Sequence, residues 1–383
     1  MASSWFCLSS GNSQMIQTID VTTLQTWLSQ GQSVSVLDVR PEADWQEWSI
    51  PQSVHAEAYH DLKAGQLAPA LQNLNLPQNQ PIVTVCGMGK MSLVAAEQLQ
   101  ARGYQVYSLA GGMQAWSLAW NSAQLPTLAN GTEIIQIRRT GKGCLSYLIG
   151  SQGQALVIDA SLDPAVYLQL AQARGWQLQA VLDTHIHADH LSRSRQLAEL
   201  SGATFYLPAN QRNSGVYQPI SANMQIQLGA ATIQALATPG HTWESMSYLL
   251  DGSHLFSGDT LFLAAVGRPD LEAQAAEAQQ RASALYQSLQ TILALDPASI
   301  ILPGHTSKPV AFDGVPIMAS LAEVQTATPR LAQTEAEFVA GLTAVRPATP
   351  PNHQTIVQLN QAGAALPDDL ITLEAGANRC AIA

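Results

Sequence analysis

The sequence has few charged residues, and most of those are acidic. Charged residues make up only 12% of the 383 positions, with 17 Lys and Arg against 28 Asp and Glu, so the formal net charge is -11. A chain with this balance and no basic clusters is poorly suited to bind polyanions, so we expect no nucleic-acid partner. It also lacks any apolar run near the roughly 20 residues that span a membrane. We therefore expect no membrane association.

Cysteine is scarce as well. The four cysteines, Cys7, Cys86, Cys144 and Cys380, lie far apart and form no CxxC pair. This distribution excludes a dense disulfide framework and favours a reducing compartment. The segment MASSWFCLSSGNSQ has neither the basic start nor the apolar stretch that is typical of a secretory signal. We expect a cytoplasmic protein.

The secondary-structure pattern divides the chain into two halves. In the first half, β-branched runs at 33–39 and 81–86 alternate with helical patterns such as 91–103. This alternation predicts an α/β domain with a parallel sheet flanked by helices. In the second half, many short strands with interspersed helices, such as 271–295, favour two sheets flanked by helices. We predict a tail (1–13), a first domain (14–120), a linker (121–132), a second domain (133–342) and a C-terminal extension (343–383).

Side chains that bind metals follow several predicted strands of the second half. They lie in the motifs THIHADH, TPGH, SGDT and PGH. Histidine binds metals well, and functional side chains are often placed in the loops after strands. We expect these residues to converge on one pocket: His185, His187, Asp189, His190, His241, Asp259 and His305.

These motifs resemble the metallo-β-lactamase superfamily over about residues 131–330. The resemblance implies an αββα sandwich with a metal pocket at one edge of its sheets. In the dinuclear hydrolases of this superfamily, one metal would be held by the positions of His185, His187 and His241. The second would be held by the positions of Asp189, His190 and His305. Asp259 would bridge two Zn²⁺ ions, whose charge activates a water molecule.

A subset of the same residues suits a different metal. His185, His241 and Asp259 alone form a facial triad of two imidazoles and one carboxylate, which is typical of a single non-haem Fe(II). The persulfide dioxygenase branch of the superfamily uses the matching positions for one iron. The ligand types by themselves leave iron and zinc open.

That branch also carries a Gly-Arg-(Thr/Pro)-Asp element, which here reads VGRPDL at 266–271. Arg268 has two alternative roles. Its guanidinium matches a substrate carboxylate in a bidentate pair, and it equally matches the nearby carboxylate of Asp270.

One cysteine of the first half lies in a loop that leads into a predicted helix. A glycine-rich turn at a helix start directs backbone N–H groups and a positive dipole toward the centre of the loop. Such a loop acidifies a thiol and stabilises a sulfur anion, so Cys86 is a candidate catalytic residue. The persulfide-binding loop would then comprise Gly87, Met88, Gly89, Lys90, Met91 and Ser92.

The segments LDVRPEADW (37–45), CGMGKMS (86–92) and LAGGMQAW (109–116) together resemble the rhodanese (sulfurtransferase) domain, over about residues 14–120. The resemblance implies that Cys86 carries sulfane sulfur as a persulfide. Many members have Arg where this chain has Met91, which leaves the donor preference open.

A sulfur carrier fused to a metal pocket indicates one metabolite shared by both sites. We expect an enzyme of sulfur metabolism that oxidises glutathione persulfide with O₂ to sulfite at one Fe(II) per chain. Cys86 would transfer sulfane sulfur and could form or consume thiosulfate. The remaining predicted pocket residues would orient ligands or handle protons.

Two alternatives remain. One is a hydrolase of glutathione thioesters with two Zn²⁺ ions, resembling glyoxalase II, with a fused sulfur-carrier domain. The other is a sulfur-binding module whose metal site is mainly structural or regulatory. Dimers are frequent in the family that the second half resembles, so a homodimer is one expected assembly, although the sequence leaves the oligomeric state open.

Overall fold

The computed structural model describes residues 15–210, 212–271, 273–345, 347–363, 365–376 and 379–383. These residues form two compact units. The first contains residues 15–45 and 52–112, and the second contains residues 46–51 and 113–383. In the described ranges, no helix is both long enough and apolar enough to span a membrane.

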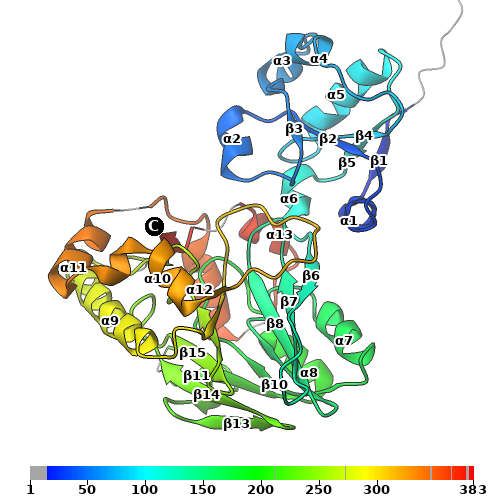
Figure 1. The fold of residues 1–383 in the computed structure, drawn as a ribbon. Helices are drawn as coiled ribbons and strands as arrows, with labels where there is room; N and C mark the ends of the chain where they lie inside the picture. Colours follow the sequence, from blue (N-terminus) through cyan, green and yellow to red (C-terminus); the bar gives the residue numbers. More distant parts are fainter. Residues whose placement is uncertain (1–14, 211, 272, 346, 364, 377–378) are drawn as a thin grey trace, which may run out of the picture. The chain divides into compact units, whose positions relative to one another are not determined.

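A five-stranded parallel sheet forms the centre of the first unit (Figure 1). Its strands, in spatial order, are β1 (Gln17–Ile19), β5 (Val106–Leu109), β4 (Ile82–Val85), β2 (Ser35–Asp38) and β3 (Val54–His55). Its helices are α1 (Val21–Ser29), α3 (Tyr59–Lys63), α4 (Pro69–Gln72) and α5 (Lys90–Gln100). Strands β2 and β4 are buried at every position, as in parallel sheets covered on both faces. The predicted α/β architecture is confirmed.

Two mixed sheets form the second unit. The first, in spatial order, contains β12 (Gln218–Ile220), β11 (Thr204–Pro208), β10 (Gln177–Leu182), β9 (Gln154–Ile158), β8 (Leu145–Ser151), β7 (Glu133–Arg138) and β6 (Asn121–Gln124). The second contains β13 (Gln225–Leu228), β14 (Ala231–Ala237), β15 (Met246–Leu250), β16 (His254–Gly258), β18 (Ile300–Pro303) and β19 (Ala319–Ser320).

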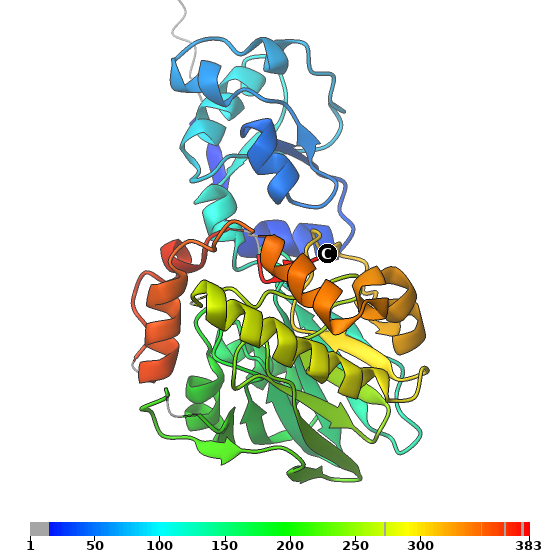
Figure 2. The same cartoon turned by 90° about the vertical axis from the view of Figure 1, so that its left-hand side faces the viewer.

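The two sheets pack face to face, and helices cover their outer faces. Tyr147 of one sheet meets Phe256 of the other in the shared core, with ring centroids 4.8 Å apart. On the outside of the first sheet lie α7 (Pro164–Gln172) and α8 (Ser194–Ser201). On the outside of the second lie α9 (Ala275–Leu293), α10 (Leu321–Ala327) and α11 (Glu335–Ala344), and Figure 2 shows α9 across that face. The predicted αββα sandwich is confirmed.

Part of the segment predicted as a linker (121–132) is a strand. β6 pairs antiparallel with β7 at the edge of the seven-stranded sheet. Ala123 and Leu125 are each only 2% exposed. An edge strand buries only alternate side chains, so its exposed polar residues gave this segment the composition of a linker.

The C-terminal extension (343–383) folds onto the second unit. It contains the helices α12 (His353–Ala362) and α13 (Leu370–Glu374) and the short strand β20 (Ala381–Ile382). β20 pairs antiparallel with β17 (Val266–Gly267), which belongs to the predicted VGRPDL element. The last described residues therefore lie beside a segment that the sequence linked to the metal pocket.

Candidate metal centre

The seven predicted pocket residues lie together in the second unit. They are carried by the loops after β10, β14, β16 and β18, and each side chain is at most 3% exposed. The imidazole of His185 lies 4.3 Å from that of His187 and 5.0 Å from that of His241, measured between ring centroids. The strands of both sheets thus deliver their C-terminal loops to one buried site.

Three of these side chains form a group of their own. The candidate ligand atoms of His185, His241 and Asp259 lie within 4.8 Å of one another. Oδ2 of Asp259 is 3.6 Å from Nε2 of His241 and 3.9 Å from Nε2 of His185. Both distances are too long for hydrogen bonds and suit atoms that face a common centre.

Several buried atoms around this centre have no hydrogen-bond partner in the described part of the chain. They are His185 Nε2, His187 Nδ1, His190 Nε2 and Asp259 Oδ2. Burying a polar atom without a partner is unfavourable, and such atoms are rare in folded proteins. All of them have lone pairs that bind divalent metals. The residues therefore fit a metal centre.

Hydrogen bonds on the outer side of two rings determine which nitrogen faces the centre. Nδ1 of His241 donates to the carbonyl oxygen of Arg268 at 2.9 Å. The Thr184 hydroxyl donates to Asp159 at 2.9 Å, so it accepts from Nδ1 of His185, also at 2.9 Å. Both imidazoles consequently carry their proton on Nδ1 and present the Nε2 lone pair to the centre.

Asp159 also orients a third ring. Its Oδ1 lies 3.2 Å from Nε2 of His187, and Nδ1 of that ring has no hydrogen-bond partner in the described part of the chain. Asp159 was not among the predicted pocket residues, although its position directly after the buried strand β9 was an available signal. Asp183, at the start of the histidine motif, has other partners, since it accepts from the hydroxyls of Ser192 and Ser194.

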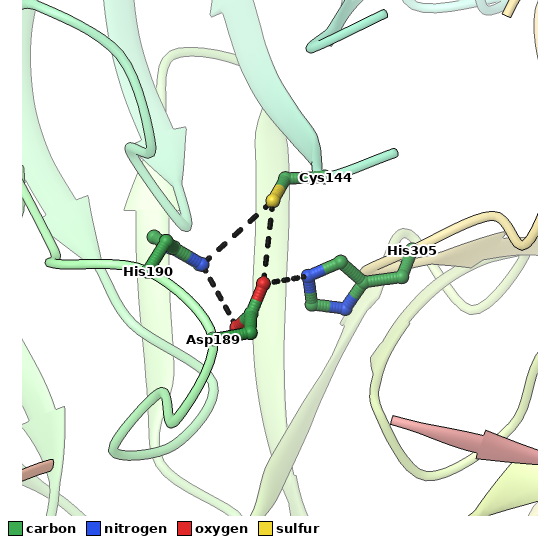
Figure 3. Close-up of side chains that lie close together, drawn as sticks. All are labelled: Cys144, Asp189, His190 and His305. Atoms are coloured by element: carbon green, nitrogen blue, oxygen red, sulfur yellow. Dashed lines mark hydrogen bonds and ion pairs between the residues drawn. The ribbon is translucent and has the colours of Figure 1, made fainter. Parts of the chain in front are cut away.

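A second group beside the triad contains a cysteine (Figure 3). Cys144, Asp189, His190 and His305 place one candidate ligand atom each within 4.8 Å of the others. Burial and Asp189 raise the pKa of Cys144, but His190 and His305 lower it to about 6. Cys144 was not among the predicted pocket residues, because a lone cysteine outside any motif is by default a buried structural thiol.

His305 joins the two groups through its two ring nitrogens. Nδ1 lies 2.6 Å from Oδ1 of Asp259, and Nε2 lies 3.0 Å from Oδ2 of Asp189. Burial lowers the pKa of His305, but Asp259 and Asp189 raise it well above its usual range. Asp259 therefore directs one oxygen to the triad and the other to this imidazole.

Cys380, from the C-terminal extension, lies near the same carboxylate. It forms a group with Asp259 and His305 in which the candidate ligand atoms are again within 4.8 Å. Burial raises the pKa of the Cys380 thiol well above its usual value, and Asp259 and Asp189 raise it further. Because Cys380 is far from the histidine motifs in the sequence, its position near the pocket could not be predicted either.

Arg268 does not offer its side chain to a substrate. It is 1% exposed, and its Nε and Nη2 both donate to the carboxylate of Asp270 at 2.8 Å. Its remaining N–H groups donate to the carbonyl oxygens of Pro347, Ala348 and Arg379. All five guanidinium donors are thus engaged inside the protein. Of the two roles that the sequence leaves open for Arg268, this geometry matches the pairing with Asp270.

Two residues of the extension hold the loop that carries the histidine motif. The side-chain amide of Asn360 donates to the carbonyl oxygens of His187 and His190, at 2.8 and 2.9 Å. Glu374, which is 1% exposed, accepts from the Leu191 N–H at 2.7 Å and pairs with Arg193. The extension therefore holds the backbone of the loop that carries the candidate ligands.

Two cavities are lined in part by residues of the pocket. One of about 430 Å³ is lined by His185 and His187 together with polar residues that include Arg195 and Asn360. Another of about 690 Å³ reaches His305 and is lined by largely apolar loops. Each is large enough for a small ligand.

The cysteine loop of the first unit has the predicted form. It connects β4 to α5, and Cys86 is 2% exposed. The Gly89 N–H donates to Sγ of Cys86 at 3.2 Å, and Ser92 Oγ lies 3.5 Å from the same sulfur. Gly89 has φ of 85°, and a Cβ there would lie 2.9 Å from the backbone nitrogen of Gly111. Met88 is 65% exposed, and Lys90 is also exposed, whereas Met91 is half-buried.

Comparison with known proteins identifies both units. Residues 20–119 match the rhodanese-like domain, and residues 139–219 match the metallo-beta-lactamase superfamily. A hydroxyacylglutathione hydrolase of Anaeromyxobacter dehalogenans is 31% identical over 225 residues, covering 56% of this chain and 84% of that protein. The chain belongs to the metallo-beta-lactamase superfamily. Its first unit is a rhodanese domain.

Solved structures of the superfamily resemble this chain under different names. ETHE1 from Myxococcus xanthus is 31% identical with a TM-score of 0.52, covering 60% of this chain and 97% of that one. A metallo-beta-lactamase from Staphylococcus aureus is 29% identical with a TM-score of 0.56, covering 62% and 74%. The first curated relatives are named hydroxyacylglutathione hydrolase or a protein like it, and the chain spans only 51–64% of their length.

Proposed function

We propose that this protein oxidises the sulfane sulfur of glutathione persulfide with O₂, using one Fe(II) at His185, His241 and Asp259. The overall reaction consumes one persulfide, one O₂ and one water, and it releases glutathione, sulfite and two protons. The sulfur–sulfur bond breaks, the sulfane sulfur is oxidised, and O₂ is reduced. Fe(II), when bound, supplies open positions at which both substrates bind and react.

This proposal rests on the different contacts of the two carboxylate oxygens of Asp259. Its Oδ2 faces the two imidazoles of the triad, whereas its Oδ1 contacts Nδ1 of His305 at 2.6 Å. A carboxylate that bridges two metals through both of its oxygens directs the second oxygen at the second ion. Here that oxygen is directed at a ring nitrogen, which favours a single metal at the triad over a bridged pair.

The surroundings of the triad support a bulky, polar thiol substrate. The cavity of about 430 Å³ opens onto His185 and His187, and its wall includes Arg195, Glu199 and Asn213. We assign the peptide part of glutathione to this cavity, because its charged ends and amide groups match a wall of this kind. His187, whose Nδ1 has no partner among the described residues, would hold or move a proton near the substrate sulfur.

The rhodanese unit supports the same substrate class. In the proposal, Cys86 exchanges sulfane sulfur with glutathione persulfide or thiosulfate and holds it as a persulfide. The Gly89 N–H and the start of α5 stabilise the anion on this sulfur. Cys86 and the triad thus share glutathione persulfide as a common substrate or product.

An oxygen electrode tests the proposal. The protein is stripped of metal, loaded with Fe(II) without air, and then given glutathione persulfide and O₂. We expect O₂ uptake with matching sulfite formation, and loss of both in Asp259→Asn. Iron-loaded protein that consumes no O₂ with this substrate would overturn the proposal.

The second candidate is a binuclear zinc hydrolase of glutathione thioesters. The names of the curated relatives and the presence of all seven pocket residues favour it. It predicts two metals per chain and cleavage of a glutathione thioester without O₂ uptake. The same metal-stripped protein, loaded with Zn²⁺ and assayed with a glutathione thioester, distinguishes the two.

A further inference from the structure

The first unit has few cations that could attract an anionic sulfur donor to Cys86. Its described residues carry seven carboxylates and only four cations, which are Arg40, Lys63, Lys90 and Arg102. A dianion that approaches an acidic unit needs compensating positive charge close to its path. The contacts of these four side chains therefore bear on which donors Cys86 accepts.

Arg40 is close to the cysteine loop in the sheet, but its charge is already paired. It follows β2, the strand beside β4, and β4 leads directly into Cys86. Its Nε and Nη2 donate to the carboxylate of Asp38, with Nη2 2.7 Å from Oδ2, and the arginine is only 7% exposed. A guanidinium that holds a carboxylate in this way adds little net positive charge to the loop.

Two further cations of the unit make contacts elsewhere. Arg102 donates to two backbone carbonyl oxygens, those of Leu71 and Leu74. Lys63 lies over an aromatic ring of its own helix, α3, at 5.8 Å from the ring centroid. Among the described residues of the unit, Lys90 is therefore the one cation that belongs to the cysteine loop.

The two residues after Cys86 form an open and apolar rim. A Cβ on Gly87 would meet no atom within 4 Å, and the Met88 side chain is 65% exposed. The base of the loop is closely packed, because a Cβ on Gly112 would lie 2.2 Å from the carbonyl oxygen of Cys86. The base thus holds the sulfur in place, whereas the rim has room for a bulky donor and offers it a polarisable thioether.

The two classes of donor differ in the charge that departs when the sulfur is transferred. Thiosulfate releases sulfite, which is a dianion, whereas a thiol persulfide releases a thiolate with a single charge. Lys90 and the start of α5 together supply about one and a half positive charges. This amount compensates a departing thiolate better than a departing sulfite.

We propose that Cys86 takes sulfane sulfur from thiol persulfides in preference to thiosulfate, and that Met88 sets this preference. The Cys86 thiolate attacks the outer sulfur of the persulfide R–S–SH and forms a bond to it. The bond between the two donor sulfurs breaks, and its electron pair leaves with the thiolate R–S⁻, so charge balances and no oxidant is consumed. The proposal rests on the carrier role of Cys86 in the proposed function, and it is independent of oxidation at the triad.

Loading of Cys86 in the full-length protein tests this preference. The protein is stripped of metal, so that no donor is lost to oxidation, and is mixed with glutathione persulfide or with thiosulfate. Mass spectrometry follows the gain of one sulfur atom on the peptide that contains Cys86. We expect the second-order rate constant to be about 10-fold higher for glutathione persulfide, with thiosulfate as a slow donor.

Met88→Lys tests the residue itself. The substitution adds a cation at an exposed position of the rim and should raise the rate of loading from thiosulfate about 10-fold. This gain should shrink at high ionic strength, which a change in packing would not produce. Met88→Leu, which keeps an apolar side chain of similar size, is the matched control and should retain the wild-type preference.

Two results would overturn the proposal. One is equal rates of loading from both donors in the wild type, and the other is an unchanged thiosulfate rate in Met88→Lys. Loading from neither donor would overturn the carrier role of Cys86 and this proposal with it. Failure of the iron-loaded protein to consume O₂ would overturn only the proposed oxidation, because these rates are measured without metal.

Discussion

Nδ1 of His241 donates to the backbone carbonyl of Arg268 across 2.9 Å. The VGRPDL element thus acts on the metal centre through its main chain, and the Arg268 guanidinium secures that main chain through Asp270 and three carbonyl oxygens of the extension. An arginine that the sequence linked to the substrate thus holds the backbone carbonyl that orients the imidazole of His241.

We therefore expect Arg268→Met to reduce stability rather than substrate affinity. Removing a buried guanidinium leaves Asp270 and three carbonyl oxygens without their partner, which costs about 3 kcal/mol. Thermal unfolding and the KM for glutathione persulfide measure the two effects. Arg330→Met, at a half-buried arginine whose Nε donates to the carbonyl oxygen of Ala383, is the control, with a smaller change of about 1 kcal/mol. A large rise in KM with no change in the free energy of unfolding would instead indicate that Arg268 contacts the substrate.

Asp159→Asn should weaken metal binding at the triad. The carboxylate accepts from the Thr184 hydroxyl and lies beside Nε2 of His187, so it orients two imidazoles. Loss of such a partner typically lowers metal affinity about 10–100-fold. Competition with a chelator for Fe(II) measures the change. Asp163→Asn, at the exposed N-cap of α7, should bind iron like the wild type. Equal affinities in all three proteins would contradict the orienting role.

Glu374→Gln should remove a pH-dependent part of the stability. Burial raises the pKa of Glu374, but Arg139 and Arg193 lower it to about 2, below its ordinary value of 4.5. Because the folded pKa is lower than the unfolded one, the stabilisation is complete above pH 4.5 and is lost as the pH falls toward about 2. It amounts to about 3 kcal/mol.

Unfolding by urea between pH 6 and pH 3 measures this effect. The wild type should lose stability across the lower part of the range, and Glu374→Gln should be less stable at pH 6 and change less. Glu97→Gln, at an exposed position of α5, is the control that should follow the wild type. If the free energy of unfolding changed with pH in the same way in Glu374→Gln and the wild type, the ion pairs of Glu374 would not contribute this stabilisation.

Cys86→Ser should separate the two activities. The substitution removes the only thiol in the loop between β4 and α5, so transfer of sulfane sulfur from thiosulfate to cyanide should stop. O₂ uptake with added glutathione persulfide should persist, because the triad lies in the other unit. Thiocyanate formation and the oxygen electrode measure the two rates. Loss of both rates in a folded protein would contradict independent sites.

The sequence revealed those parts of the site that depend on local pattern. Each of the four motifs follows a strand, so their side chains lie in neighbouring loops at one edge of the sheets. The motifs are THIHADH, TPGH, SGDT and PGH. Cys144 escaped detection because its partner His305 is distant in sequence and the two meet only through strand pairing. Asn360 and Glu374 belong to no recognisable sequence motif. A polar residue on a helix is common, so neither could be linked to the histidine loop from the sequence. The edge strand β6 was hidden by its exposed polar face.

The contacts of Asn360 and Glu374 with the histidine loop have a consequence for biosynthesis. A ribosome releases THIHADH long before it releases α12 and α13. Until then the carbonyl oxygens of His187 and His190 and the N–H of Leu191 lack the partners that they have in the folded chain. The histidine loop therefore takes the form described here only after α12 and α13 have been synthesised and have packed against it.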